Sequence, residues 1–316
     1  MSELLPVLRD MICEADAGRP SALCVVVQTS GSTPRRPGAA MLLRADLTAL
    51  GTVGGGYVEA DVKRRASEVL QQRGTAVLDF SLDRDLGRGD GPICGGRMSV
   101  GVTTVTPDAD LEPYRRAVES LQRRERAWFP IVVEQKGKRL EYRVHLEVPP
   151  TLLIAGAGHV GQAVARLAGA LDFHVVVIDD RADCAARERF GSDVKLIVDD
   201  IGSALRSYPI DSACFVVIVT RGHQHDYQAL DAVVRSPAHY VGMIASKRKA
   251  QMIFGRLAAS GVPPELIDRV HSPIGLPIGA ATVPELAVSI VAELVQARRR
   301  DTPKLVEGPT QSTTDG

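Results

Sequence analysis

The residue pattern with the clearest chemistry is the segment TLLIAGAGHVGQAVARLA, which begins at Thr151. Gly156, Gly158 and Gly161 form the spacing G-x-G-x-x-G between an apolar strand and an apolar-periodic helix. The first glycine permits a tight turn, the second lets the backbone approach a phosphate, and the third lets the helix pack on the strand. The N-terminus of the helix adds free amides and a favourable dipole. We therefore predict a phosphate site in this turn.

A carboxylate ends the next predicted strand. Asp179 lies about 20 residues beyond the glycines, where a Rossmann fold places the acid that bonds the hydroxyls of an adenosine ribose. Arg181 follows it, so a 2′-phosphate is the alternative. The pattern predicts a Rossmann fold, but it leaves open NAD, NADP or another ligand, because this fold serves many functions.

Polar residues also follow a later apolar strand, FVVIVT. Arg221, His223, His225 and Asp226 come directly after it, and ligands of doubly wound sheets bind beyond the carboxyl ends of the strands. These side chains would hydrogen-bond a ligand or substrate. A metal site is the second interpretation, although two histidines and one acid are a thin set of ligands. Ordinary loop structure is the third.

A basic turn follows the fifth strand of this half. Ser246 precedes Lys247, Arg248 and Lys249 at the start of a predicted helix. A hydroxyl and three cations suit an anion, and the alternative is a solvated basic turn.

The N-terminal half contains a triple-glycine loop. Gly54, Gly55 and Gly56 join a strand to a helix, and their amides can form one anion-binding concavity. Glu59, in the first turn of that helix, suits the helix dipole. The alternative is that the glycines only make a tight corner.

A thiol beside two glycines marks a second loop. Cys94 precedes Gly95 and Gly96, so its thiol is either sterically accessible or a small buried hydrophobe. Arg88 and Arg97 are near in sequence and would lower the pKa of this thiol.

A third loop, residues 30–38, combines hydroxyls with guanidiniums. Thr33 and Arg35 are its candidate ligands for a phosphate-bearing or otherwise anionic molecule. A solvated turn is again the alternative.

The hydrophobic pattern predicts an α/β protein in which a smaller mixed α/β domain precedes a Rossmann-like, doubly wound parallel sheet. We expect the first domain at residues 1–148, the second at 149–300, and a disordered Thr-, Pro-, Gly- and Ser-rich tail at 301–316. The prolines of Glu147–Pro150 mark the boundary between the domains. In the second domain, strands are expected at 151–155, 174–178, 195–198, 214–220 and 239–244, and helices at 160–171, 182–190, 227–235, 247–260 and 284–299.

Composition limits the class of function. The 316 residues include 38 Lys plus Arg and 38 Asp plus Glu, so the net charge is zero, which argues against a nucleic-acid-binding protein. We see no signal-peptide pattern and no apolar run long enough to span a bilayer. The five scattered cysteines should be reduced thiols, so we expect a cytoplasmic protein with no membrane contact.

Taken together, the motifs resemble those of the xanthine dehydrogenase accessory proteins, the XdhC/CoxI family. The resembling stretches include GSTPRRPGAAMLL, GTVGGGYVEADV, ICGGRMSV, VIDDR, VIVTRGHQHD, YVGMIASKRK and HSPIGLPIGAATVPELAVSIVAEL. They occur in the family's order and extend over both predicted domains.

The resemblance implies an accessory protein rather than a catalyst. Members of the family are thought to bind the molybdenum cofactor, support its sulfuration and deliver it to an apo-enzyme such as xanthine or carbon monoxide dehydrogenase. A cysteine desulfurase is an expected second partner. Many members have cysteine after the triple glycine, where this chain has Tyr57, so Cys94 becomes the candidate contact to molybdenum or its sulfur.

The sequence leaves open the role of the C-terminal helix and two other functions. The apolar helix at Leu286–Leu294 would form a homodimer interface or simply pack on the sheet. An NAD(P)-dependent oxidoreductase is the runner-up function, and a nucleotide-sensing module without turnover is the third.

Overall fold

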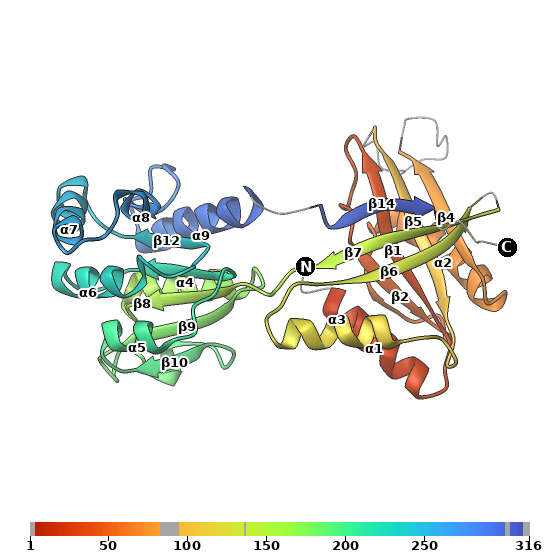
Figure 1. Ribbon diagram of the computed structural model, residues 1–316, viewed down its shortest axis with the longest axis horizontal. Coiled ribbons are helices and arrows are strands. Elements are labelled where there is room, and N and C mark those ends of the chain that lie inside the picture. Colours follow the sequence, from red (N-terminus) through yellow and green to blue (C-terminus); the bar gives the residue numbers. More distant parts are fainter. Residues whose placement is uncertain (1–3, 83–94, 136, 301–303, 312–316) are drawn as a thin grey trace. The chain divides into compact units, whose positions relative to one another are not determined.

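The computed structural model describes residues 4–82, 95–135, 137–300 and 304–311, which form two compact units (Figure 1). The first unit comprises Met1–Val148 and Pro303–Gly316, and the second comprises Pro149–Thr302.

The first unit is built on a five-stranded antiparallel sheet with the strand order β3-β2-β1-β5-β4. The central strand pairs Val25 with Ala40 on one side and with Gly101 on the other. The strands are β1 (Ser21–Ser30), β2 (Ala40–Arg44), β3 (Ala49–Gly51), β4 (Thr75–Ser81) and β5 (Arg97–Val105).

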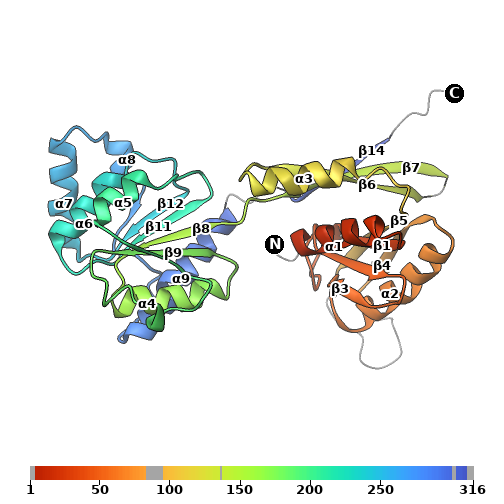
Figure 2. The same ribbon diagram turned by 90° about the horizontal axis from the view of Figure 1, so that it is seen from below.

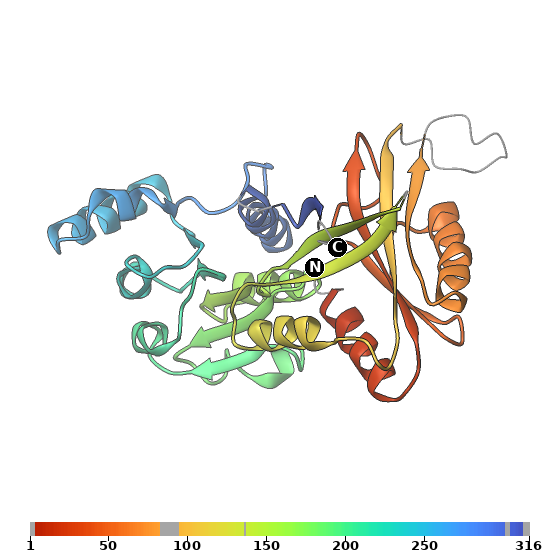
Figure 3. The same ribbon diagram turned by 45° about the vertical axis from the view of Figure 1, so that its right-hand side comes forward.

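Helices cover both faces of this sheet because β1 is apolar on both sides. Cys24 and Val26 face helix α2 (Gly56–Gln71), whereas Leu23 and Val25 belong to the core cluster that includes residues of α1 (Leu4–Asp16) and α3 (Glu112–Gln122). Figure 3 shows α2 on one side of the sheet and α1 and α3 on the other. The period-2 alternation of a strand therefore divides the core into two layers.

A second, three-stranded sheet with the order β14-β7-β6 packs over the α1 and α3 side. Its strands are β6 (Ala127–Gln135), β7 (Lys138–Leu146) and β14 (Val306–Gln311). Strand β14 corrects the expectation that the whole tail is disordered. Val306 pairs with Val144 and is buried, and the Leu305 carbonyl accepts a hydrogen bond from the His145 amide. Gly308 and Pro309 fall where the register shifts, which an edge strand tolerates.

The second unit confirms the predicted Rossmann-like fold. Its six parallel strands have the order β10-β9-β8-β11-β12-β13. They are β8 (Thr151–Ala155), β9 (His174–Asp179), β10 (Lys195–Val198), β11 (Cys214–Ile218), β12 (Tyr240–Met243) and β13 (Val270–His271). Helices α4 (His159–Gly169) and α9 (Val283–Arg300) cover one face, and α5 (Ile201–Ser207), α6 (His223–Val233) and α7 (Lys247–Ala259) cover the other (Figure 2). The short helix α8 (Pro264–Asp268) precedes β13.

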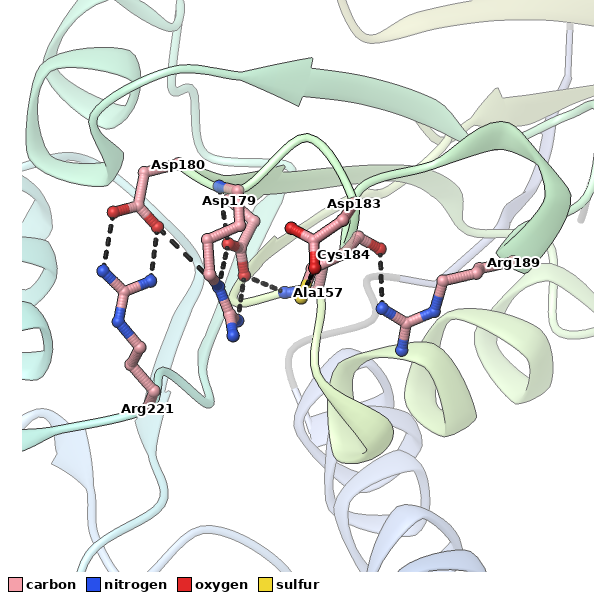
Figure 4. Close-up of polar contacts among 8 residues, drawn as sticks. Ala157, Asp179, Asp180, Asp183, Cys184, Arg189 and Arg221 are labelled. Atoms are coloured by element: carbon pink, nitrogen blue, oxygen red, sulfur yellow. Dashed lines mark hydrogen bonds and ion pairs between the residues drawn. The ribbon is translucent and has the colours of Figure 1, made fainter.

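The α-helix predicted at residues 182–190 is wrong. Only the 3-10 turn Arg187–Arg189 is helical there, although three alanines favour a helix. Two hydrogen bonds hold this backbone in a non-helical conformation. The Arg181 amide donates to the Asp179 carboxylate, and the Arg189 guanidinium donates to the Cys184 carbonyl (Figure 4). Among the described residues, no helix is long and apolar enough to cross a membrane.

Candidate functional site

The first candidate site lies at the carboxyl edge of the six-stranded sheet. The strand order reverses direction between β8 and β11, and such a reversal opens the crevice in which open α/β sheets bind ligands. The glycine turn follows β8, Asp179 ends β9 and Asp180 follows it, and Arg221 comes after β11. The fold thus brings together residues that the sequence separates widely.

Two of the three glycines in the turn are required by packing within the chain, because a side chain there would clash with the backbone. A Cβ on Gly156 would lie 2.5 Å from the Val219 carbonyl oxygen, and a Cβ on Gly161 would lie 2.0 Å from the Gly156 carbonyl oxygen. Gly158 differs from both. Its backbone is extended, at φ −68° and ψ −172°, and no described atom lies within 4 Å of an added Cβ.

Asp179 does not present a free carboxylate to a ligand. It is only 1% exposed, and Oδ2 accepts a hydrogen bond from the Ala157 amide in the glycine turn at 2.7 Å. Arg181 donates to it from its amide, Nε and Nη2 at 2.9–3.0 Å. Burial raises the pKa of Asp179, but the hydrogen bonds from Arg181 and Ala157 outweigh burial and lower the pKa below its ordinary value.

A second arginine-carboxylate pair lies beside the first. The Arg221 guanidinium donates two bonds to the Asp180 carboxylate, at 2.6 Å and 2.8 Å (Figure 4). Both side chains are partly exposed, Arg221 by 42% and Asp180 by 30%. The hydrogen bonds from Arg221 lower the pKa of Asp180 to about 2, so this carboxylate is charged throughout the physiological range.

The residues that follow Arg221 separate in space. His223 is exposed at the start of α6, His225 is half-buried, and Asp226 is fully buried. Within the described ranges, no group of three or more His, Cys, Asp or Glu side chains is arranged to hold a metal ion. The pattern His-x-His-Asp is therefore not assembled as one ligand set.

Asp226 instead forms a buried ion pair with the basic turn. Its Oδ1 accepts a hydrogen bond from the Thr220 hydroxyl at 2.6 Å, and its Oδ2 contacts the Lys249 ammonium. Ser246 caps α7 by accepting a hydrogen bond from the Lys249 amide. Lys249, expected to meet an anionic ligand, thus neutralises a buried carboxylate of its own chain.

A polar cluster that the sequence did not predict lies in the same unit. Glu293 of α9 accepts hydrogen bonds from the Tyr240 hydroxyl and the Gly275 amide, and it contacts His271 Nδ1 at 2.7 Å. Burial raises the pKa of Glu293, but these hydrogen bonds together lower it below its ordinary value. The cluster fixes the loop after β13. The only signal in the sequence is a single acid on the apolar face of α9.

The second candidate site lies in the first unit, where three loops meet at one end of the five-stranded sheet. Ser32 forms a β-bridge with Gly95, and a Cβ on Gly31 would lie 3.1 Å from Gly96 Cα. A Cβ on Gly54 would lie 3.1 Å from the Pro34 ring. The loop after β1, the triple-glycine loop and the loop before β5 are thus in contact.

The triple-glycine loop has an unusual backbone, and its first amide has a partner within the chain, because the Gly54 amide donates to the Thr52 hydroxyl at 3.2 Å. Gly54, Gly55 and Gly56 have φ values of 156°, 69° and 53°, in the region that favours glycine. No described atom lies within 4 Å of a Cβ added at Gly55 or Gly56. The space beside the Cα atoms of these two glycines is therefore open.

Other predicted ligands in this unit have structural partners. Glu59 accepts one hydrogen bond from the Thr52 hydroxyl and pairs with Lys63 at 2.9 Å. Burial raises the pKa of Glu59, but these two partners outweigh burial and lower it. The Thr33 hydroxyl donates to the Arg35 carbonyl at 2.9 Å and fixes the turn.

The structure describes Cys13, Cys24, Cys184 and Cys214. Cys94 lies outside the described residues. Cys24 and Cys214 are buried, and burial raises the pKa of Cys24 to about 12, so it is not a thiolate. Cys13 is exposed and Cys184 is half-buried.

Comparison with known proteins decides the family. The XdhC and CoxI family model matches residues 15–81, and the XdhC Rossmann domain model matches residues 152–294. The chain belongs to the XdhC and CoxI family. The recognition based on motifs is thereby confirmed in both units.

Several relatives extend along most of this XdhC-family chain. YqeB of Escherichia coli K12 is 32% identical over 88% of this chain, which spans only 44% of the length of YqeB. A protein of Bacillus subtilis 168 named as a probable xanthine dehydrogenase subunit is 28% identical, covering 89% of this chain and 94% of that protein. The molybdenum cofactor insertion chaperone PaoD of E. coli K12 is 22% identical to this chain. The match covers 92% of this chain and 88% of PaoD.

A solved structure is similar over nearly the whole chain. A Bacillus halodurans protein described as a xanthine dehydrogenase has a TM-score of 0.79 and 25% identity, covering 95% of this chain and 97% of that one.

Proposed function

We propose that this chain binds the molybdenum cofactor, supports its sulfuration and inserts it into a molybdenum hydroxylase such as xanthine or carbon monoxide dehydrogenase. The observation that carries the proposal is the meeting of three glycine-bearing loops at one end of the five-stranded sheet. Membership of the XdhC and CoxI family and the chaperone name of PaoD support the same role.

The chemistry of the three loops fits such a cargo. Molybdopterin is a flat, polar molecule that carries a phosphate, sometimes as part of a nucleotide. The amides of Gly55 and Gly56 would bond that phosphate, and the guanidinium of Arg35 would add charge-assisted hydrogen bonds. Cys94 precedes Gly95 in the sequence and would supply a soft sulfur contact to molybdenum or to the incoming sulfide.

The partners follow from the role. A carrier must release its cargo, so we propose a transient complex with the apo-enzyme and a second contact with a cysteine desulfurase. A homodimer of this chain belongs to the same proposal.

Cys94→Ser tests the thiol directly. We expect molybdenum bound per folded chain, and the activity of a reconstituted client enzyme, to fall about tenfold or more, because a hard oxygen replaces a soft sulfur. The melting temperature should stay close to that of the wild type. Cys13→Ser, at an exposed cysteine, is the matched control and should change none of these quantities.

The opposite pattern would contradict the assignment. If Cys94 is a buried structural residue, the serine hydroxyl will destabilise the fold while each folded chain still retains molybdenum normally.

A further inference from the structure

Helix α9 carries apolar side chains on two sides. One side is buried in the core of the second unit, where it packs beside α4, and it consists of Ala287, Ile290, Val291 and Leu294. A surface helix with one covered side normally shows charged and polar residues on the other, and a helix that is apolar all round is normally buried all round. The second apolar side of α9 therefore points to a partner.

The second side is formed by Val288, Ala292 and Val295, which we call the outer stripe. Spacings of four and three residues place these side chains along one side of the helix. Val288 is 51% exposed, and Ala292 and Val295 are half-buried. The outer stripe thus has a small residue at its centre and a β-branched residue on each side of it.

No charge interrupts the outer stripe. Between Glu285 and Arg298 the only charged residue is Glu293, and its carboxylate is turned to the inside of the unit, where it accepts a hydrogen bond from the Gly275 amide. The exposed side of α2 is different, because Arg64 pairs there with acids one turn away on both sides. The middle of α9 therefore offers a charged partner nothing to pair with.

Opposite charges lie at the two ends of the outer stripe. Glu285 precedes Val288 by one helical turn and Arg299 follows Val295 by one turn, so both continue the stripe, and both are exposed. They are about four turns apart, roughly 21 Å along the helix. Two such helices side by side match acid with base at both ends when they run antiparallel. A parallel arrangement would set like charges against each other.

We propose that α9 pairs with α9 of a second copy of this chain, in an antiparallel arrangement whose two-fold axis passes at Ala292. Ala292 lies midway between Glu285 and Arg299, so the axis that pairs these charges also sets the small side chain against itself and lets the helices approach closely. Val288 of each copy then packs against Val295 of the other.

The choice of a second copy follows from the charges. A two-fold contact sets the same surface against itself, which an uncharged stripe with complementary ends accepts and a stripe of one sign does not. The inference rests on the homodimer named in the proposed function, and it gives that dimer its surface. It does not depend on the cargo.

A charge at the axis tests the pairing on the full chain. In sedimentation experiments over a range of concentrations, Ala292→Glu should raise the dimer dissociation constant about a hundredfold or more, because two carboxylates would face each other in the contact. Glutamate is a good helix former, so the melting temperature of the monomer should stay close to that of the wild type. Met252→Glu, at an exposed apolar residue of α7, is the matched control and should leave the dissociation constant unchanged.

Cysteine cross-linking tests the direction of the helices. Under mild oxidation Ala292→Cys should form a covalent dimer, since the two copies of that position meet at the axis. Glu285→Cys alone should not, because its two copies lie roughly 21 Å apart, far beyond the reach of about 7 Å between the Cα atoms of a disulfide. The double variant Glu285→Cys/Arg299→Cys should cross-link again. The wild type, with its native cysteines, and Met252→Cys are the controls.

The outcomes separate this surface from the rest of the proposed function. If Ala292→Glu stays as dimeric as the wild type, the copies meet through another surface, and the inference is wrong while the homodimer stands. If Glu285→Cys alone cross-links as well as the double variant, the helices are not antiparallel at Ala292. A wild type that is monomeric at about 100 μM refutes both the surface and the dimer. None of these measurements involves molybdenum, so the carrier role is tested separately.

Discussion

Gly161→Ala should destabilise the second unit by about 3 kcal/mol or more, whereas Gly158→Ala should change its stability by less than about 1 kcal/mol. The new methyl group on Gly161 would lie 2.0 Å from the Gly156 carbonyl oxygen, so helix α4 must move away from the turn. At Gly158 no described atom stands in the way.

Hydrogen exchange measured on peptides from β8 and α4 locates the effect in the second unit, which a global melting curve would not do. A binding assay gives a second test of the role of Gly158. Gly158→Val should weaken phosphate binding while the fold survives, because the larger side chain would cover the turn. Equal stability losses at Gly158 and Gly161 would contradict the distinction between a packing glycine and a ligand-facing glycine.

Lys249→Met should cost about 3–5 kcal/mol, because it leaves the fully buried Asp226 carboxylate without its cation. Urea unfolding, with exchange of the α6 and α7 amides, measures the loss. Lys247→Met, in the same helical turn, is the matched control. Its side chain is exposed, so a change within about 0.5 kcal/mol is expected.

The companion change shows whether the charge is the cause. Asp226→Asn removes the buried charge, so the double variant Asp226→Asn/Lys249→Met should regain a large part of the stability lost in Lys249→Met. If the double variant is no more stable than Lys249→Met alone, the loss in Lys249→Met does not come from an unpaired charge on Asp226.

Much of the second unit could be predicted from sequence. The glycine spacing and the alternation of apolar strands with helices specify a parallel sheet, because both signals are local in the chain. The helix predicted at residues 182–190 does not form, because the Arg181 amide just before it bonds Asp179 and the Arg189 guanidinium bonds the Cys184 carbonyl within it. Strand β14 was missed because its pairing partner, β7, lies far away in sequence.

Site residues could be named from sequence, but their partners could not. The end of β9 predicted the place of Asp179, yet not that Arg181 and Ala157 occupy its carboxylate. Asp226 and Lys249 were assigned to separate loops, and only the packing of α6 against α7 brings them into contact. The meeting of the three loops in the first unit likewise depends on the pairing of β1 with β2 and β5.

The measurement that tests the central claim most directly is native mass spectrometry, with metal analysis, of the full chain from a molybdenum-replete host. A parallel preparation comes from a host that cannot make the pterin. We expect molybdopterin and molybdenum to accompany the chain in the first preparation, and neither to accompany it in the second. Copurified NAD or NADP without pterin would contradict the carrier role and favour an oxidoreductase or a nucleotide sensor. A chain free of pterin in both preparations, even when supplied with the isolated cofactor, would also contradict it.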